Sequence, residues 1–221
     1  MAQEALLSQA LVPATALIFM LEVVHLGCLR GERTLFSDLN FSLSPGELIQ
    51  VAGANGSGKT SLLRLLCGLS SPLVGEIRWN HAPARGEYFH RDLLYLGHLA
   101  AVKEELTALE NLQIANTFAG APLTKEQALE ALARIGLGGR EHLPTKVLSQ
   151  GQKRRVMLAR LLVSDAPLWI LDEPLTALDV HAVELIQARL AEHLAKQGMI
   201  VLTTHQALQV PGITPRRIAL G

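Results

Sequence analysis

The sequence predicts an α/β fold in which a parallel sheet carries an inserted helical subdomain. Strand-like apolar segments alternate with helical segments towards both ends of the chain. Between about residues 103 and 139 the strand signals vanish and only helical periodicity remains. The run "APLWILDEP" at 166–174 is almost continuously apolar until its charges and proline, which is typical of a parallel strand buried on both faces.

The sequence predicts at least five strands and four helices. Each predicted helix has apolar residues at helical spacing, and each predicted strand is a short apolar run. Strands are predicted at 46–53, 75–80, 92–98, 166–174 and 199–205, and helices at 59–69, 106–119, 124–137 and 181–198.

Residues 1–19 form an N-terminal extension with two open interpretations. The segment is a disordered extension, or the start codon has been assigned upstream of Met20. The apolar stretch at 11–24 is shorter than the roughly 20 residues that a membrane span needs. It also lacks the basic region and cleavage site of a signal peptide. Its later half, "ALIFMLEVVHL", suits a strand.

Composition narrows the class of protein. The 221 residues are 49% apolar, enough for one large domain or two small ones. A net charge of zero argues against a surface dominated by nucleic-acid binding. Cys28 and Cys67 match no paired-cysteine motif, so we expect two ordinary core residues in a reducing compartment, with no disulfide framework and no zinc site.

The stretch "GANGSGKT", Gly53 to Thr60, predicts a phosphate-binding loop between a strand and a helix. Its glycines let main-chain N–H groups face phosphate oxygens, and the helix N-terminus adds partial positive charge. Lys59 can bridge the β- and γ-phosphates, and the Thr60 hydroxyl can bind Mg²⁺. The residues expected to hold the nucleotide here are Gly53, Asn55, Gly56, Ser57, Gly58, Lys59, Thr60 and Ser61.

Two later strand ends add the polar groups that nucleotide hydrolysis requires. Asp172 ends a buried strand, where it can hold Mg²⁺ directly or through water. Glu173 beside it can polarise the attacking water. His205 follows another strand of the same expected sheet, and ligands bind at the carboxyl ends of such strands. We therefore predict that Glu173 and His205 are catalytic.

The stretch "LSQGQKRR", residues 148–155, predicts a second anion site at a helix start. Ser149 has an N-cap-like position, and Gly151 permits a close approach to the main chain. One nucleotide cannot obviously use both sites of one chain, so we expect a dimer in which Ser149, Gly151 and Gln152 contact the partner's ATP. We interpret residues 153–155 as a solvated helix face, one member of which could help to hold that interface.

This set of motifs resembles that of the ATP-binding cassette (ABC) ATPases over essentially residues 20–221. "GANGSGKT" is similar to Walker A, "LSQGQ" to the signature motif, "LWILDEP" to Walker B, "LTALD" to the D-loop and "TTH" to the switch histidine. The resemblance implies a P-loop NTPase fold with a mixed sheet core at about 20–97 and 156–221 and a helical subdomain at about 98–155. It also implies an ATP-sandwich dimer, with ATP and Mg²⁺ as ligands and Glu173 as base.

Three departures from the family pattern are visible. The region "GCLRGER" lacks the family's adenine-stacking aromatic residue, and Arg30 could stack there through its guanidinium plane. His98 stands where the family has a glutamine. It could meet Mg²⁺ or water, contact a partner, or be an exposed loop residue. Gln150 replaces a usual glycine in the signature.

A closer resemblance is to the ATP-binding subunits of bacterial cytochrome c maturation (Ccm) haem exporters. It rests on "RTLFSDLNFSL", "YLGH", "LTALENL", "LWILDEP" and "LTTHQ". It implies a peripheral ATPase at the cytoplasmic face of the inner membrane, with integral membrane subunits as partners, which powers haem export or release of a haem chaperone. Neither nucleic acid nor direct haem binding is expected. A soluble ABC ATPase, or an ABC subunit for another substrate, stays open.

Overall fold

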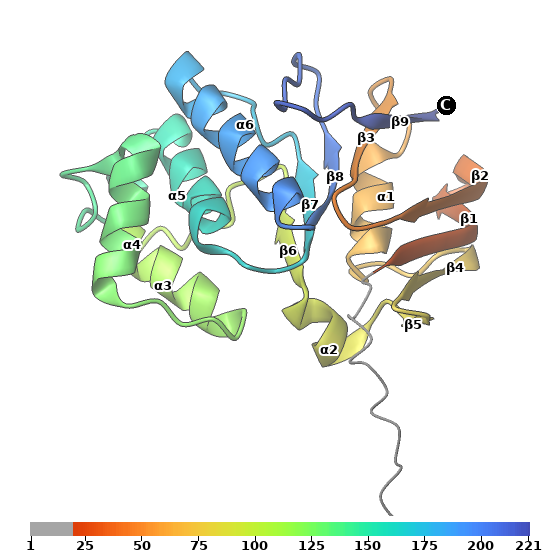
Figure 1. Ribbon diagram of the computed structural model, residues 1–221, viewed down its shortest axis with the longest axis horizontal. Helices are drawn as coiled ribbons and strands as arrows, with labels where there is room; N and C mark the ends of the chain where they lie inside the picture. Colours follow the sequence, from red (N-terminus) through yellow and green to blue (C-terminus); the bar gives the residue numbers. More distant parts are fainter. Residues whose placement is uncertain (1–19) are drawn as a thin grey trace, which may run out of the picture.

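The computed structural model describes residues 20–221, and the interpretations of residues 1–19 lie outside this range. Three parts lie side by side in the structure (Figure 1). An antiparallel sheet forms one end of the molecule, a parallel sheet lies in the middle, and a group of helices forms the other end.

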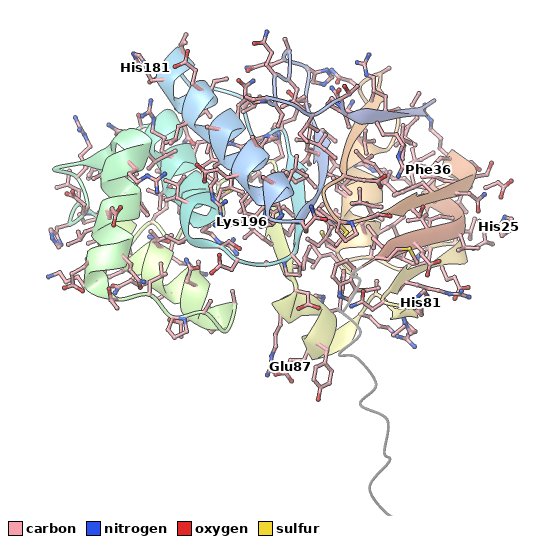
Figure 2. All side chains as sticks on the ribbon, viewed as in Figure 1. His25, Phe36, His81, Glu87, His181 and Lys196 are labelled. Atoms are coloured by element: carbon pink, nitrogen blue, oxygen red, sulfur yellow. The ribbon has the colours of Figure 1, made fainter. Side chains whose placement is uncertain are left out.

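The antiparallel sheet has the strand order β2-β1-β4-β5. It contains β1 (Leu21–Arg30), β2 (Arg33–Leu43), β4 (Val74–Trp79) and β5 (Ala82–Pro83). β4 confirms the strand predicted at 75–80, whereas no pattern predicts β2 or β5. Figure 2 shows that His25 and His81 project from this sheet, away from the helical end. Parallel and antiparallel strands are therefore separated into two sheets rather than mixed in one.

The five-stranded sheet has the order β6-β7-β8-β3-β9, and all of its strand pairs are parallel. It contains β6 (Leu93–Leu96), β7 (Leu168–Asp172), β8 (Met199–Thr203), β3 (Leu48–Gly53) and β9 (Arg216–Leu220). The prediction that 166–174 holds a buried parallel strand is confirmed, because every residue of β7 is buried. β9 is not predicted by the sequence patterns.

Both faces of the parallel sheet are apolar, and side chains alternate between them along each strand. On one face, Leu168 and Ile170 of β7 pack with α1 (Lys59–Leu66) and the antiparallel sheet. On the other face, Trp169 and Leu171 pack with α6 (Val180–Ala195) and the helical part. Burial on both faces explains why the sequences of these strands are nearly continuous runs of apolar residues.

The helical part contains α3 (Ala108–Phe118), α4 (Lys125–Leu132) and α5 (Gln150–Val163), with short helical turns η1 (Ala133–Leu137) and η2 (Thr145–Val147). A further short helix, α2 (Gly86–Arg91), precedes β6. Each of α3, α4 and α5 begins with a capping box, on Thr107, Thr124 and Ser149. α5 runs unbroken across residue 155, so the helix itself joins the proposed subdomain to the core. Among residues 20–221, no helix is long and apolar enough to cross a membrane.

Both cysteines are core residues, as predicted. Cys28 of β1 and Cys67 at the C-cap of α1 are buried free thiols in the core cluster shared by α1, the antiparallel sheet and one face of the parallel sheet. Burial raises the pKa of both thiols, which keeps them in the unreactive neutral form.

A stacked aromatic pair lies under α6. The Trp169 and His193 rings are 3.8 Å apart between centroids and nearly parallel, and the Arg189 guanidinium lies 5.0 Å from the centroid of Trp169. Burial, followed by the positive charge of Arg189, lowers the pKa of His193 to about 4. The folded protein therefore holds a neutral imidazole.

This pKa shift predicts a defined loss of stability in acid. The unfolded chain takes up the His193 proton below about pH 6.5, whereas the folded chain does so only near pH 4. Stability contributed by His193 is complete above about pH 6.5 and falls by about 3 kcal/mol as the pH drops to 4. In His193→Gln this part of the pH dependence should disappear from urea-unfolding curves. The exposed His181, labelled in Figure 2, supplies the control His181→Gln, which should keep the wild-type slope.

Candidate nucleotide-binding site

The glycine-rich loop connects the end of β3 at Gly53 to the start of α1 at Lys59. At two positions of this loop, the backbone conformation or the close packing allows only glycine. Gly58 is the N-cap of α1 with φ of 102°, a left-handed conformation that disfavours side chains. At Gly53, a Cβ atom would lie 2.4 Å from both the Leu220 carbonyl oxygen and Ser57 Oγ. The loop therefore presents main-chain N–H groups and a helix N-terminus to one space.

Lys59 and Thr60 open α1 and face different partners. Lys59 Nζ donates to the Gly53 carbonyl at 2.8 Å and to the Ala54 carbonyl at 3.1 Å. Thr60 Oγ1 donates to Asp172 Oδ2 at 2.8 Å. The loop is thus connected directly to the end of β7, although the two motifs are far apart in the sequence.

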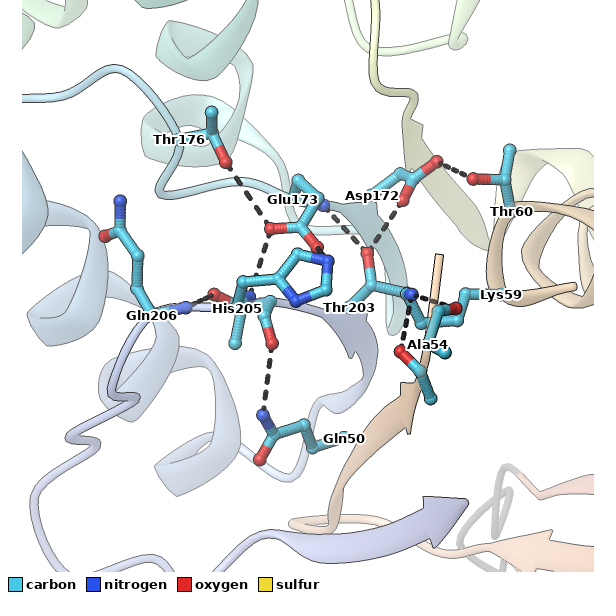
Figure 3. A network of polar contacts seen from close by, with 12 residues as sticks. Gln50, Ala54, Lys59, Thr60, Asp172, Glu173, Thr176, Thr203, His205 and Gln206 are labelled. Carbon is cyan, nitrogen blue, oxygen red and sulfur yellow. Dashed lines mark hydrogen bonds and ion pairs between the residues drawn. The ribbon is translucent and has the colours of Figure 1, made fainter. Parts of the chain in front are cut away.

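A buried threonine connects the two acidic residues (Figure 3). Thr203 Oγ1 donates to Asp172 Oδ1 at 2.7 Å and accepts from the Glu173 N–H at 2.9 Å. Thr203 is fully buried at the end of β8, in register with Asp172. No sequence motif predicted this role for Thr203. Its signal was a threonine pair that ends an otherwise apolar strand in "MIVLTTH".

Glu173 has a constrained main chain and a carboxylate that faces His205. Its φ of 53° lies in the left-handed region, which is uncommon for a residue with a side chain. Its Oε2 accepts from the His205 N–H at 3.2 Å and from Thr176 Oγ1 at 3.4 Å. Its Oε1 lies 3.4 Å from His205 Nε2. These contacts hold the Glu173 side chain at the ends of β7 and β8, in the cavity that the glycine-rich loop also lines (Figure 3).

Lys59, Thr60, Asp172, Glu173 and His205 line one cavity of about 590 Å³, whereas Gly53 and Thr203 do not line it. Arg30 and His98, which stand at two of the three departures from the family pattern, also line it. The cavity is lined by Arg30, Leu35, Asn55, Gly56, Gly58, Lys59, Thr60, Ser61, His98, Asp172, Glu173, Thr176, His205 and Gln206. The structure thus brings together residues from the first strand, the glycine-rich loop and four other segments.

The helix start at Ser149 lies outside this cavity. Ser149 is the N-cap of α5, as predicted, and its Oγ accepts from the Gln152 N–H at 3.2 Å. Gln152 Oε1 in turn accepts from the Ser149 N–H at 2.9 Å. A Cβ at Gly151 would find no atom closer than 3.6 Å, so this helix start is open to approach. One chain does not bring Ser149, Gly151 and Gln152 to its own glycine-rich loop.

The prediction that residues 153–155 form a solvated face is wrong. Lys153 is buried and forms an ion pair with Glu104 at 2.5 Å. Arg155 donates to the Ile135 carbonyl at 2.8 Å and pairs with Asp179. Arg154 is buried beneath the candidate site.

Helical spacing explains this correction. Arg154 precedes Met157 by three residues and Leu158 by four, so all three share one face of α5. Met157 and Leu158 are core residues. The basic residues begin the buried stripe of the helix, and the spacing could have identified them despite their charge.

The residues present fit a bound Mg²⁺ ion. The Thr60 hydroxyl and the Asp172 carboxylate, 2.8 Å apart, are hard oxygen ligands of the kind that Mg²⁺ prefers. No group of three or more histidine, cysteine or acidic residues among residues 20–221 could hold a metal alone. Mg²⁺ commonly binds one or two protein oxygens and completes its shell with phosphate oxygens and water.

Comparison with known proteins identifies close relatives. A family model described as ABC transporter matches residues 36–176. Over 203 residues the chain is 57% identical to the cytochrome c biogenesis ATP-binding export protein CcmA of Nitrosospira multiformis, covering 90% of this chain and 98% of that protein. It is also 57% identical over 205 residues to CcmA of Nitrosomonas europaea, covering 92% and 96%.

The fold is also found among solved structures. An ATP-binding cassette, solved as a dimer in a post-hydrolysis state bound to ADP and Pi, superposes with a TM-score of 0.76. The match covers 90% of this chain and 94% of that one at 23% identity. At this identity the likeness establishes the fold alone.

The geometry predicts that the Thr203 hydroxyl is needed for turnover. Thr203→Val keeps the shape of the side chain but leaves the buried Glu173 N–H without its acceptor, which should lower the free energy of unfolding by about 1–3 kcal/mol. Nucleotide turnover should fall because the Asp172 and Glu173 positions are no longer linked. Thr203→Ser retains the hydroxyl and should keep most of the wild-type stability and most of the wild-type turnover. Denaturant unfolding and steady-state nucleotide hydrolysis would measure these effects, and a valine variant equal to the serine variant would refute the role.

Proposed function

Because the chain belongs to the ABC transporter family and, within it, to the cytochrome c biogenesis ATP-binding export proteins, we propose that it powers a haem-handling membrane complex. The chain is an ABC-type ATPase. The proposed complex serves haem export, or release of a haem chaperone, in c-type cytochrome biogenesis. The names of its relatives, which describe export in cytochrome c biogenesis, support this role.

The proposed nucleotide site uses the glycine-rich loop and two strand ends. Main-chain N–H groups of residues 53–61 bind the phosphates, and Lys59 bridges the β- and γ-phosphates. Thr60 and Asp172 would hold Mg²⁺, which when bound neutralises charge on the phosphates. Arg30 and Leu35 line the cavity, and no phenylalanine, tyrosine or tryptophan is among its lining residues, so Arg30 is the group that can stack on the base.

Hydrolysis is proposed to depend on Glu173 as the base. Its carboxylate orients the attacking water and accepts a proton, while His205 contacts the γ-phosphate and the water. The single observation that carries this assignment is the linked network from Thr60 through Asp172, Thr203 and Glu173 to His205. His98 also lines the cavity and is a further candidate for contact with Mg²⁺ or water.

We propose that a second copy of the chain completes each site. Ser149, Gly151 and Gln152 lie outside the cavity that contains the loop of their own chain. The helix start at Ser149 is open and is suited to an anion. In a two-fold dimer, each signature helix would meet the γ-phosphate of the nucleotide on the other copy.

Membrane partners are proposed to dock on residues 98–118. This segment carries three exposed large apolar side chains, Leu99, Ile114 and Phe118, with exposed fractions of 80%, 40% and 88%. Such side chains suit a protein partner rather than water. This docking would place the chain peripherally at the cytoplasmic face of the bacterial inner membrane.

The base assignment predicts that Glu173→Gln binds ATP but hydrolyses it very slowly. The amide cannot accept a proton, so turnover should fall by about 100-fold or more, in the range attributed to general base catalysis. The variant should accumulate as an ATP-bound dimer in gel filtration. The contrasting variant Lys59→Ala should lose ATP affinity instead. Near-normal turnover by Glu173→Gln would refute the base, and unchanged affinity of Lys59→Ala would refute the phosphate site.

The partner assignment predicts co-purification with haem-handling integral membrane subunits. Phe118→Asp should reduce recovery of these subunits and of the chain in the membrane fraction, because a charge replaces an exposed apolar contact. The matched control is Leu73→Asp, which changes an exposed apolar residue outside the segment. Recovery with nucleic acid would favour a soluble ABC ATPase. Recovery with membrane subunits that handle no haem would favour another transport substrate.

A further inference from the structure

The guanidinium group of Arg154 is buried and binds main-chain carbonyls from two strand ends. The exposed fraction of Arg154 is 7%. Its Nη1 donates to the His98 carbonyl at 2.5 Å and to the Gly97 carbonyl at 3.3 Å. Its Nη2 donates to the Asp172 carbonyl at 3.2 Å and also to the Glu173 carbonyl.

These carbonyls belong to neighbouring strands at the edge of the candidate site. β6 and β7 pair in parallel register, with Leu96 opposite Leu171. Residues 97–98 follow β6, and residues 172–173 end and follow β7. A planar guanidinium presents its N–H groups as a rigid fork, so it can span both strand ends at once. A lysine ammonium cannot reproduce this geometry.

The charge of Arg154 is compensated locally. Burial lowers the pKa of Arg154, while the carboxylates of Asp172 and Glu173 act in the opposite direction. The four carbonyl dipoles also point their negative ends at the guanidinium. The residue can therefore remain charged beneath the site, because buried charges persist where they are paired and hydrogen-bonded.

We propose that Arg154 is a positioning residue for hydrolysis, which fixes the main chain of Glu173 and His98 and ties both to the helix that begins at Ser149. This inference rests on the proposed function, in which Glu173 is the base. Arg154 itself does not line the cavity. It acts through the residues whose carbonyls it holds.

The backbone of Glu173 explains why such a hold matters. Its left-handed conformation, with φ of 53°, persists only where surrounding contacts enforce it. Thr203 holds the Glu173 N–H and Arg154 holds its carbonyl, so the residue is fixed on both sides. Without the guanidinium the peptide can relax, and a displacement of about 1 Å at a catalytic group can reduce turnover about 100-fold.

The test compares Arg154→Met and Arg154→Lys in the full chain, purified with its membrane partners. Arg154→Met should lower kcat by about 10- to 100-fold. It should leave KM for ATP within about threefold of wild type, because the hydrogen bonds of Arg154 go to residues 97, 98, 172 and 173 and not to the phosphate-binding loop. Arg154→Lys keeps a charge but not the fork and should recover only part of kcat. The control Arg160→Met removes another arginine of α5, near the N-terminal ends of β6 and β7, and should keep kcat.

A double-mutant cycle with Glu173→Gln separates positioning from general structural support. If Arg154 acts through Glu173, Arg154→Met should slow single-turnover hydrolysis far less in the Glu173→Gln background than in wild type. Multiplicative losses would overturn the inference, as would a folded Arg154→Met protein with wild-type kcat. The inference would also be overturned if Arg154→Met lost kcat only in proportion to its folded fraction and Arg160→Met showed the same losses. Normal turnover by Glu173→Gln alone would instead overturn the proposed function.

Discussion

The candidate site depends on one constraint, which is that β7 is buried over its whole length. Asp172 and Glu173, at and just after the end of this strand, are themselves buried, so most of their polar groups must find partners within the protein. Asp172 and Glu173 find them on α1, β8 and α5, in Thr60, Thr203 and Arg154. The polar network thus lies where the apolar core ends, and its members come from α1 on one face of the sheet, from α5 on the other face and from the neighbouring strand β8.

The same constraint connects the two halves of the molecule. α1 and the glycine-rich loop pack on one face of the parallel sheet, and α5 packs on the other. In the site they meet at the carboxyl edge of the sheet, where Thr60 reaches β7 from one side and Arg154 reaches it from the other. A movement of α5 that accompanies nucleotide or partner binding would therefore act directly on the strand end that carries Glu173.

The sequence predicted the parts of the site that consist of short contiguous motifs. The glycine-rich loop, Asp172, Glu173 and His205 could be located because each follows an apolar strand, and strand ends meet at one edge. Arg154 was predicted to be exposed because it is charged, although its spacing places it on the buried face of α5. Thr203 was overlooked because its role depends on strand register. β2 was not predicted because bulges in its pairing with β1 interrupt its alternation, and β9 because it is largely exposed.

At Glu173, the left-handed backbone conformation lowers stability, whereas the proposed activity requires the side chain that bears this cost. Glycine adopts this conformation freely, whereas other L-residues bear a cost of roughly 1–2 kcal/mol there. Selection for stability alone would accept a glycine at 173, and the carboxylate would be lost. Laboratory evolution of this protein towards heat resistance should therefore be paired with a screen for turnover. Otherwise the most stable descendants can be those that no longer carry the proposed base.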